Sequence, residues 1–335
     1  MSLRFWFPLQ PDIYRPIGGV KQVHRIAEAF SSLGCPSTII QDSKDFHPGW
    51  FSSNVTTISG DEWSVISKEI EASSNVVVIP ETYISHFNLI SPNLPKIIFN
   101  QNSSYTFGLN PKKLIPPKHI FESYHSPMLK HVLCVSHYDY QFLTDCIQLP
   151  SYRVSRIVNS IDFPVQPRRF IKKKKIAYMP RKNPRDSSIL SGLISNHPYL
   201  KDYELVAIDS CTHEQVLNQL SESLVFLSFG HPEGFGLPLA EAIASCCAVI
   251  GYSGLGGNEL FSICAKYGIA FQVDYGDYLG FIHSINSFFA MLQRDKDATL
   301  LSLSSAASVV RSSYNFEAMV DSASSALTSI EKHFV

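Results

Sequence analysis

Short apolar runs that alternate with amphipathic helical stretches constrain this chain more than any other feature. The run Val76–Ile79 is apolar at every position rather than at alternate ones, and a strand of this kind is covered on both faces. Segments with helical periodicity lie between such runs, for example at 19–32 and 238–245. Strands that alternate with helices favour an α/β fold with open, mostly parallel sheets.

Nine runs have the length and composition of strands, at residues 3–7, 38–40, 75–79, 96–99, 131–135, 175–179, 204–208, 224–228 and 248–252. Helices are predicted at 19–32, 138–146, 214–221, 238–245 and 282–292. The length of 335 residues predicts about two domains. Prolines and the basic run Lys172–Lys175 interrupt the pattern, so we predict a first domain at 1–165 and a second at 172–315. We expect the helical stretch 316–335 to pack back on the first domain.

Composition narrows the classes of protein to consider. With 45% hydrophobic and 17% charged residues the chain buries a sizeable core, which excludes wholesale disorder. The net charge of −1 gives no attraction to nucleic acid, so we expect no nucleic-acid partner. No apolar run approaches the ~18 residues that span a bilayer, and the N-terminal residues lack a signal-peptide layout. The seven cysteines form no C-x-x-C pair, and together these features predict a cytoplasmic protein.

The stretch 226–242, FLSFGHPEGFGLPLAEA, combines a strand end, a Gly/Pro loop and a helix start. Pro238 suits the first turn of a helix, because its missing N–H would be unpaired there. Gly234 and Gly236 leave the backbone open to a ligand, and the N–H groups of a helix N-terminus favour a phosphate. Glu241 lies one turn into the helix, where its two oxygens match the adjacent hydroxyls of a ribose. The segment predicts a nucleoside-diphosphate site; the alternative is a strand-loop-helix turn with a helix-stabilising glutamate.

The string Glu233-Gly-Phe-Gly-Leu-Pro-Leu-Ala-Glu241 resembles the E-x7-E signature of the family-four retaining glycosyltransferases, also called glycosyl transferases group 1. Downstream, Ser253–Glu259 resembles the glycine-rich turn of that family, and Arg156–Asp162 resembles the stretch before its linker. Gly18-Gly19 resembles the glycine pair that faces the donor phosphates. The resemblance covers most of residues 1–315. It implies the GT-B fold, in which two Rossmann-like domains with mostly parallel sheets face a central cleft.

The resemblance also implies roles for individual residues. Glu233 would face the transferred sugar, and Arg181 and Lys182 would clamp the diphosphate and stabilise its charge as it leaves. Arg185 is a further candidate for this clamp. The donor-binding residues that the resemblance implies are Glu241, Gly234, Phe235, Gly236, Leu237, Gly18 and Gly19.

The acceptor side departs from the family pattern. Family members often place a histidine after the strand that here covers 96–99, whereas this chain has amides there. Amides form hydrogen bonds with sugar hydroxyls. We therefore predict an acceptor side that includes Asn100, Gln101, Asn102 and His125.

No metal and no cofactor are predicted, because the sequence has no D-x-D pair at a strand end and its histidines lack ligand spacing; a nucleotide-sugar would be a substrate. The basic segment 153–185 holds eleven Lys/Arg and one acid, Asp162. It has two interpretations. One is a patch that attracts an anionic membrane face or a lipid-phosphate acceptor, which would make the protein peripheral to the inner membrane face. The other is a charged linker together with the diphosphate clamp.

The function that the resemblance implies is transfer of a sugar from a UDP- or GDP-linked donor to a glycan or lipid-linked acceptor. The transfer would retain the anomeric configuration and need no metal, and it would serve polysaccharide or glycan assembly. Two alternatives stay open: a non-catalytic nucleotide-sugar-binding or assembly subunit, and a sugar-nucleotide epimerase.

Overall fold

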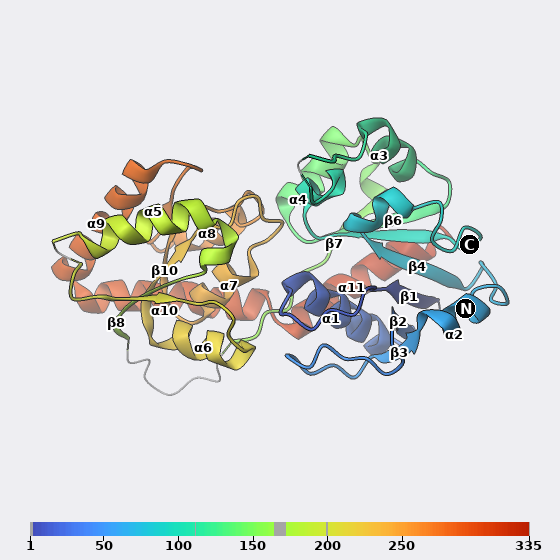
Figure 1. Cartoon of the computed structure of the whole chain (residues 1–335), viewed down its shortest axis with the longest axis horizontal. Coiled ribbons are helices and arrows are strands. Elements are labelled where there is room, and N and C mark those ends of the chain that lie inside the picture. Colours follow the sequence, from blue (N-terminus) through green and yellow to red (C-terminus); the bar gives the residue numbers. More distant parts are fainter. Residues whose placement is uncertain (1–2, 111, 164–171, 199, 335) are drawn as a thin grey trace. The chain divides into compact units, whose positions relative to one another are not determined.

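The computed structural model describes residues 3–110, 112–163, 172–198 and 200–334. The chain forms two compact units: one runs up to Ser160 and resumes at Asn315, and the other spans Ile161–Tyr314. Each unit has its own parallel sheet with helices packed against it (Figure 1). The prolines of the predicted linker, Pro164 and Pro167, lie outside the described residues.

The first unit contains a seven-stranded sheet in the order β3-β2-β1-β4-β5-β6-β7, with every pairing parallel. Its strands are β1 (Arg4–Pro8), β2 (Ser37–Gln41), β3 (Thr56–Ser59), β4 (Asn75–Pro80), β5 (Lys96–Asn100), β6 (Leu129–Cys134) and β7 (Val154–Arg156). Its helices are α1 (Gly18–Ser32), α2 (Gly60–Ile66), α3 (Pro117–Tyr124), α4 (His137–Gln141) and α11 (Phe316–Glu331), with the short turns η1 (Glu81–His86), η2 (Ser103–Phe107), η3 (Phe142–Cys146) and η4 (Ser151–Arg153).

The second unit contains a five-stranded parallel sheet in the order β12-β11-β10-β8-β9. Its strands are β8 (Lys173–Tyr178), β9 (Glu204–Ala207), β10 (Ser223–Ser228), β11 (Ala248–Gly251) and β12 (Phe271–Gln272). Its helices are α5 (Pro184–Ser195), α6 (His213–Glu222), α7 (Leu237–Ala244), α8 (Asn258–Ala265), α9 (Tyr278–Arg294) and α10 (Lys296–Ser313), and η5 (Pro180–Lys182) follows β8.

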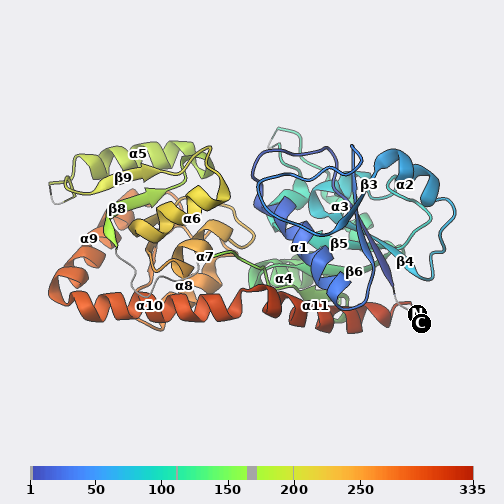
Figure 2. The same ribbon diagram turned by 90° about the horizontal axis from the view of Figure 1, so that it is seen from below.

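The central strands are apolar because both of their faces are covered. In β4, Val77 and Ile79 belong to one buried cluster, while Val76 and Val78 are as deeply buried on the opposite face. Helix α11 packs against α1 within the first unit (Figure 2). Its buried face consists of Met319, Ala323, Ala326 and Ile330, which recur at helical spacing.

The α/β fold class with mostly parallel sheets is confirmed, and all nine predicted strands occur within two residues of their expected bounds. Three strands were not predicted, namely β3, β7 and β12. Each is short, lies at the edge of its sheet and is partly exposed. An edge strand of this kind has no continuous apolar run, so its sequence does not stand out from a loop.

Candidate functional site

The second sheet reverses its strand order at β8. The chain proceeds from β8 to β9 on one side, whereas β10 pairs with β8 on the other side. In open α/β sheets, ligands bind beyond the carboxyl ends of the strands at such a switch point. The segments that follow β8 and β10 carry Lys182 and Glu233, so the strongest sequence motif lies at the position that the fold favours for a ligand.

Lys182 and Glu233 meet at this switch point. The Lys182 ammonium donates a hydrogen bond to Glu233 Oε1 and forms an ion pair with it. Both side chains are largely but not fully covered, at 25% and 17% exposure. Arg181 and Arg185, the other two candidate cations, are exposed to solvent. The structure therefore brings one of the three candidate cations against Glu233.

The glycine-rich turn packs directly on the loop that carries Glu233. The Glu233 N–H donates to the Gly254 carbonyl oxygen at 2.7 Å, and the Gly256 N–H donates to the Glu233 carbonyl oxygen at 3.0 Å. A Cβ on Gly256 would lie 1.8 Å from the carbonyl oxygen of Gly234. These glycines are needed because a side chain would push the two loops apart.

The N-terminus of α7 faces this region without a side-chain cap. Its N-cap residue, Gly236, has φ +87°, a left-handed conformation that glycine adopts readily, and no side chain caps the first turn. In the same unit Thr212 caps α6 and Asp277 caps α9, whereas α5 and α8, like α7, have no side-chain cap. The positive end of α7 is thus open to an anion. The helix begins at Leu237, one residue before its predicted start.

Glu241 and Phe235 lie on either side of this helix start. Glu241 is buried in α7, with 6% of its surface exposed. The Phe235 ring packs 5.0 Å from the ring of Tyr314, whose hydroxyl donates to Glu259 Oε1 at 2.8 Å. A small cavity of about 20 Å³ lies among Lys182, Glu233, Gly236 and Ser253, which is enough for a water molecule.

A buried carboxylate beside this loop pair escaped the sequence analysis. Asp186, in the first turn of α5, accepts hydrogen bonds from the Tyr252 hydroxyl at 2.9 Å and the Tyr278 hydroxyl at 2.8 Å. Burial and the bond to Asp186 raise the pKa of Tyr252. Next to Tyr252, the rings of His231 and Tyr275 stack at 4.3 Å. In sequence Asp186 has the signature of an acid that complements a helix dipole, and nothing local points to its two tyrosine partners.

The first unit has its own switch point between β1 and β4, where the order β2-β1-β4 reverses. Gln101 Nε2 donates to the Gly19 carbonyl oxygen at 3.3 Å, and the Gln101 N–H donates to Glu81 Oε2 at 3.0 Å. Glu81 follows β4 directly and is 2% exposed. Burial raises the pKa of Glu81 to about 8, with the nearby Asp139 as a smaller cause in the same direction. Glu81 was missed, although an acid directly after a fully buried strand is a recognisable signal.

The four residues predicted for the acceptor side do not form one surface. Asn100 is fully buried, and its Nδ2 donates to Thr106 and to Tyr124 inside the unit. Asn102 caps the short turn η2 by accepting from a backbone N–H. His125 binds the Ile147 carbonyl oxygen at the end of α3, before β6 begins, and so lies at the amino edge of the sheet. The three amides lie at the carboxyl end of β5, which is the opposite edge of the sheet. The prediction that His125 shares a surface with them is therefore wrong.

The basic segment has internal partners where it is described. Lys173 and Lys175 form ion pairs with Glu222. Lys172 donates to the carbonyl oxygens of Leu220 and Ser245. These contacts give Lys172, Lys173 and Lys175 partners within the unit, in line with the interpretation of the segment as a charged linker together with the diphosphate clamp. Within the described residues, no group of three His, Cys, Asp or Glu side chains is placed to hold a metal, and no described helix is long and apolar enough to cross a membrane.

Comparisons with known proteins bear on the fold and on the resemblance. No family model matches the chain. Over 197 residues, 57% of its length, the chain is 28% identical to a protein of Actinobacillus pleuropneumoniae serotype 7 (strain AP76) named alpha-1,6-glucosyltransferase. The match spans 56% of that relative, so the chain covers a little over half of it.

Several solved structures match nearly the whole chain. A glycosyltransferase from Rickettsia africae ESF-5 has a TM-score of 0.69 at 15% identity, covering 99% of this chain and 98% of its own. TarM has a TM-score of 0.70 at 9% identity, covering 98% and 99% respectively. At these identities the likeness shows the fold, which is GT-B. The expected resemblance to group 1 glycosyltransferases is thus confirmed.

Proposed function

We propose that this protein is a retaining, metal-independent glycosyltransferase that uses a UDP- or GDP-linked sugar as donor and a glycan or lipid-linked acceptor, in glycan or polysaccharide assembly. The observation that carries the proposal is the contact of Lys182 with Glu233 at the switch point of the second sheet, beside the uncapped start of α7. A diphosphate at this position would meet both the ammonium and the helix N-terminus. The relative's name makes glucose conjugates the first donors to test.

The geometry supports different roles for the charged groups of the site. Lys182 and the α7 N-terminus would stabilise the charge that develops on the leaving diphosphate. When the Lys182 ammonium binds the phosphate instead of Glu233, the Glu233 carboxylate would be available to orient the sugar. Arg181, being exposed, has the freedom to move toward the same phosphate. In a transfer with retention, the acceptor approaches on the side of the leaving phosphate. An oxygen of that phosphate then takes the acceptor proton, so the proposal needs no protein base and no metal.

Glu241 would hold the donor ribose through its two carboxylate oxygens. Its buried position in α7 fixes the carboxylate one turn beyond the phosphate-binding end of the helix. The roles of Gly18 and Gly19 toward the donor stay predictions.

The test is an assay of nucleotide release and sugar transfer with UDP- and GDP-glucose, run with and without EDTA. We expect turnover that EDTA leaves unchanged, and a loss of about 100-fold or more in kcat for Lys182→Ala, on the scale of removing one charge-stabilising donor. Glu241→Ala should mainly weaken donor binding. Lys201→Ala removes an exposed lysine of the same unit and is the matched control.

Two results would count against the whole proposal, and a third would count against one part of it. Donor binding without release of free nucleotide, over a panel of glycan acceptors, would indicate a binding subunit. Epimerisation of the sugar while it stays attached to the nucleotide would indicate a different reaction. Inverted anomeric configuration of the product, read by NMR, would refute retention alone.

A further inference from the structure

A second cavity lies in the first unit, at the edge of the sheet opposite Gly19 and Gln101. Its volume is about 270 Å³. Leu129 lines it at the amino end of β6, and Arg153 lines it just before the amino end of β7. Gly19 and Gln101 follow the carboxyl ends of β1 and β5. Because all strands of this sheet are parallel, these are opposite edges, and the cavity is separate from the candidate site described above.

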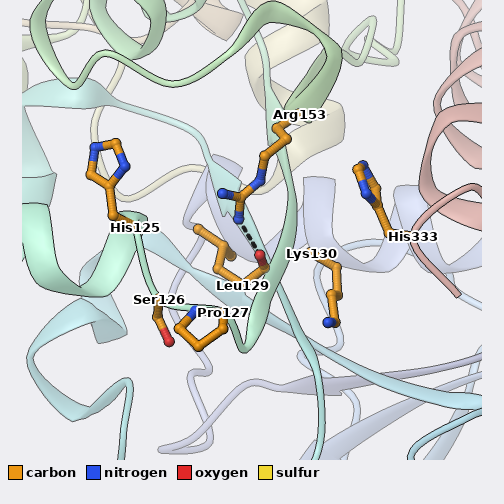
Figure 3. A pocket seen from close by; sticks show the side chains of 7 residues that line it. All are labelled: His125, Ser126, Pro127, Leu129, Lys130, Arg153 and His333. Atoms are coloured by element: carbon orange, nitrogen blue, oxygen red, sulfur yellow. Dashed lines mark hydrogen bonds between the residues drawn. The ribbon is translucent and has the colours of Figure 1, made fainter.

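Basic side chains line this cavity. Figure 3 shows the Arg153 guanidinium between His125 and His333, with Lys130 extending from the neighbouring strand. No carboxylate is among the described residues that line the cavity. Lys130 and Arg153 likewise form no ion pair with any residue that the structure describes.

The positive charge of the cavity comes from Arg153 and Lys130, and it has no carboxylate partner among the described residues that line the cavity. The Arg153 guanidinium donates to the Leu129 carbonyl oxygen, and burial lowers the pKa of Arg153. Burial also lowers the pKa of His333, and the charges of Arg153 and Lys130 lower it further. The Nε2 atom of His333 is buried and has no hydrogen-bond partner among the described residues. A cation that is removed from water without a counter-charge is costly, and an anion would offset that cost.

We propose that this cavity binds a phosphate-bearing anion. Arg153, Lys130 and His333 bring a guanidinium fork, an ammonium and an imidazole to the lining of one cavity, and several donors suit the several oxygens of a phosphate better than a single carboxylate. His125 adds only its Nδ1 edge, because its Nε2 is bonded to the Ile147 carbonyl oxygen. The cavity is larger than a lone phosphate, and Pro127 and Leu129 add an apolar wall. The phosphate would therefore be part of a small organic molecule or of a lipid headgroup.

The experiment compares Lys130→Gln and the double variant Lys130→Gln/His333→Asn with Lys68→Gln, which removes an exposed lysine of the same unit outside the cavity. Calorimetry measures binding of glycerol 3-phosphate. Co-sedimentation measures binding to phosphatidylcholine vesicles with and without phosphatidic acid. Phosphate also has a place near Lys182, and all three variants keep that place, so the difference between them reports the cavity.

We expect the double variant to bind glycerol 3-phosphate, or the phosphatidic acid vesicles, at least tenfold more weakly than Lys68→Gln. The single variant should show part of that loss. A loss in the soluble arm identifies a free phosphate compound, and a loss confined to vesicles identifies a lipid headgroup. Equal affinity of the cavity variants and Lys68→Gln in both arms would overturn the proposal. Unchanged melting temperatures would show that the variants are folded.

Discussion

At the scale of single residues, Glu81 makes a prediction about pH. Its carboxyl group is buried at the switch point of the first sheet, and burial raises its pKa from 4.5 to about 8. Because the folded state holds the proton more tightly than the unfolded state, the contribution of Glu81 to stability is full below pH 4.5 and is lost as the pH rises through 8. The loss amounts to a few kcal/mol, at about 1.4 kcal/mol per pH unit.

The measurement is the melting temperature of the protein between pH 4.5 and pH 9. Glu81→Gln cannot ionise, so its melting temperature should fall less over this range than that of the parent protein. Glu69→Gln, an exposed position of the same unit, should follow the parent. If Glu81→Gln has the same pH slope as the parent, the carboxyl group is already ionised in the folded state.

Two glycines in the second unit should respond to alanine in opposite ways. Gly256→Ala places a Cβ 1.8 Å from the Gly234 carbonyl oxygen, which forces the two loops apart and should lower both stability and donor affinity, the latter by tenfold or more. Gly192 lies inside α5 with nothing within 4 Å of an added Cβ. Gly192→Ala should therefore stabilise the unit by about 0.5–1 kcal/mol. Thermal unfolding and nucleotide titration measure both effects, and similar behaviour of the two variants would contradict the packing argument.

Sequence reasoning works best where the conformation of a residue depends on its neighbours in the chain. Gly236 and Leu237 occur in one strand-loop-helix segment, so their order along the chain already determines the helix start. Asp186 is different, because its partners Tyr252 and Tyr278 are 66 and 92 positions away in the chain. Asn100 shows the converse, since an amide that suits a sugar hydroxyl suits a buried hydrogen-bond network equally well. Only the three-dimensional arrangement separates those two roles.

At the scale of elements, the central strands were predictable because burial on both faces leaves a continuous apolar run in the sequence. The edge strands β3, β7 and β12 have one neighbour each and leave no such run. Helix starts fall into two groups, those with a side-chain cap and those without one. Thr212, Asp277 and Asp295 cap the starts of α6, α9 and α10 with their side chains. The helix predictions used none of these caps, placed the start of α9 four residues late and missed α10. The start of α7 has no cap, and its uncapped N–H groups are what make it suited to an anion.

Helix α11 provides a prediction at the same scale. Ala323 is fully buried on the face that packs within the first unit, and Ser324, the next residue, is exposed. Ala323→Leu should destabilise the first unit by about 1–3 kcal/mol, because a larger side chain does not fit between α11 and its neighbours. Ser324→Leu adds similar bulk where there is space and should change stability by less than about 0.5 kcal/mol. Chemical denaturation measures the difference, and equal effects would show that α11 is not held by this face.

At the scale of the whole molecule, the two proposed anion sites, one in each unit, differ in design. In the second unit a lysine, a glutamate and an uncapped helix lie at the carboxyl edge of the sheet, which suits a diphosphate whose charge changes during a reaction. In the first unit, cations without a carboxylate among their described neighbours lie at the amino edge, which suits an anion that is only held.

These two designs predict separate footprints in hydrogen–deuterium exchange. A nucleoside diphosphate should protect the amides of residues 179–185, 230–241 and 253–259, which follow the strands β8, β10 and β11 of the second sheet. Glycerol 3-phosphate at moderate concentration should instead protect residues 125–131 and 151–154, and Lys130→Gln/His333→Asn should abolish only this second footprint. Lys182→Ala should weaken only the first. If glycerol 3-phosphate protects the second unit alone, the cavity in the first unit is not a phosphate site, while the donor assignment stands. If the nucleotide leaves 230–241 unprotected, the donor assignment fails on its own, because the two footprints share no residue.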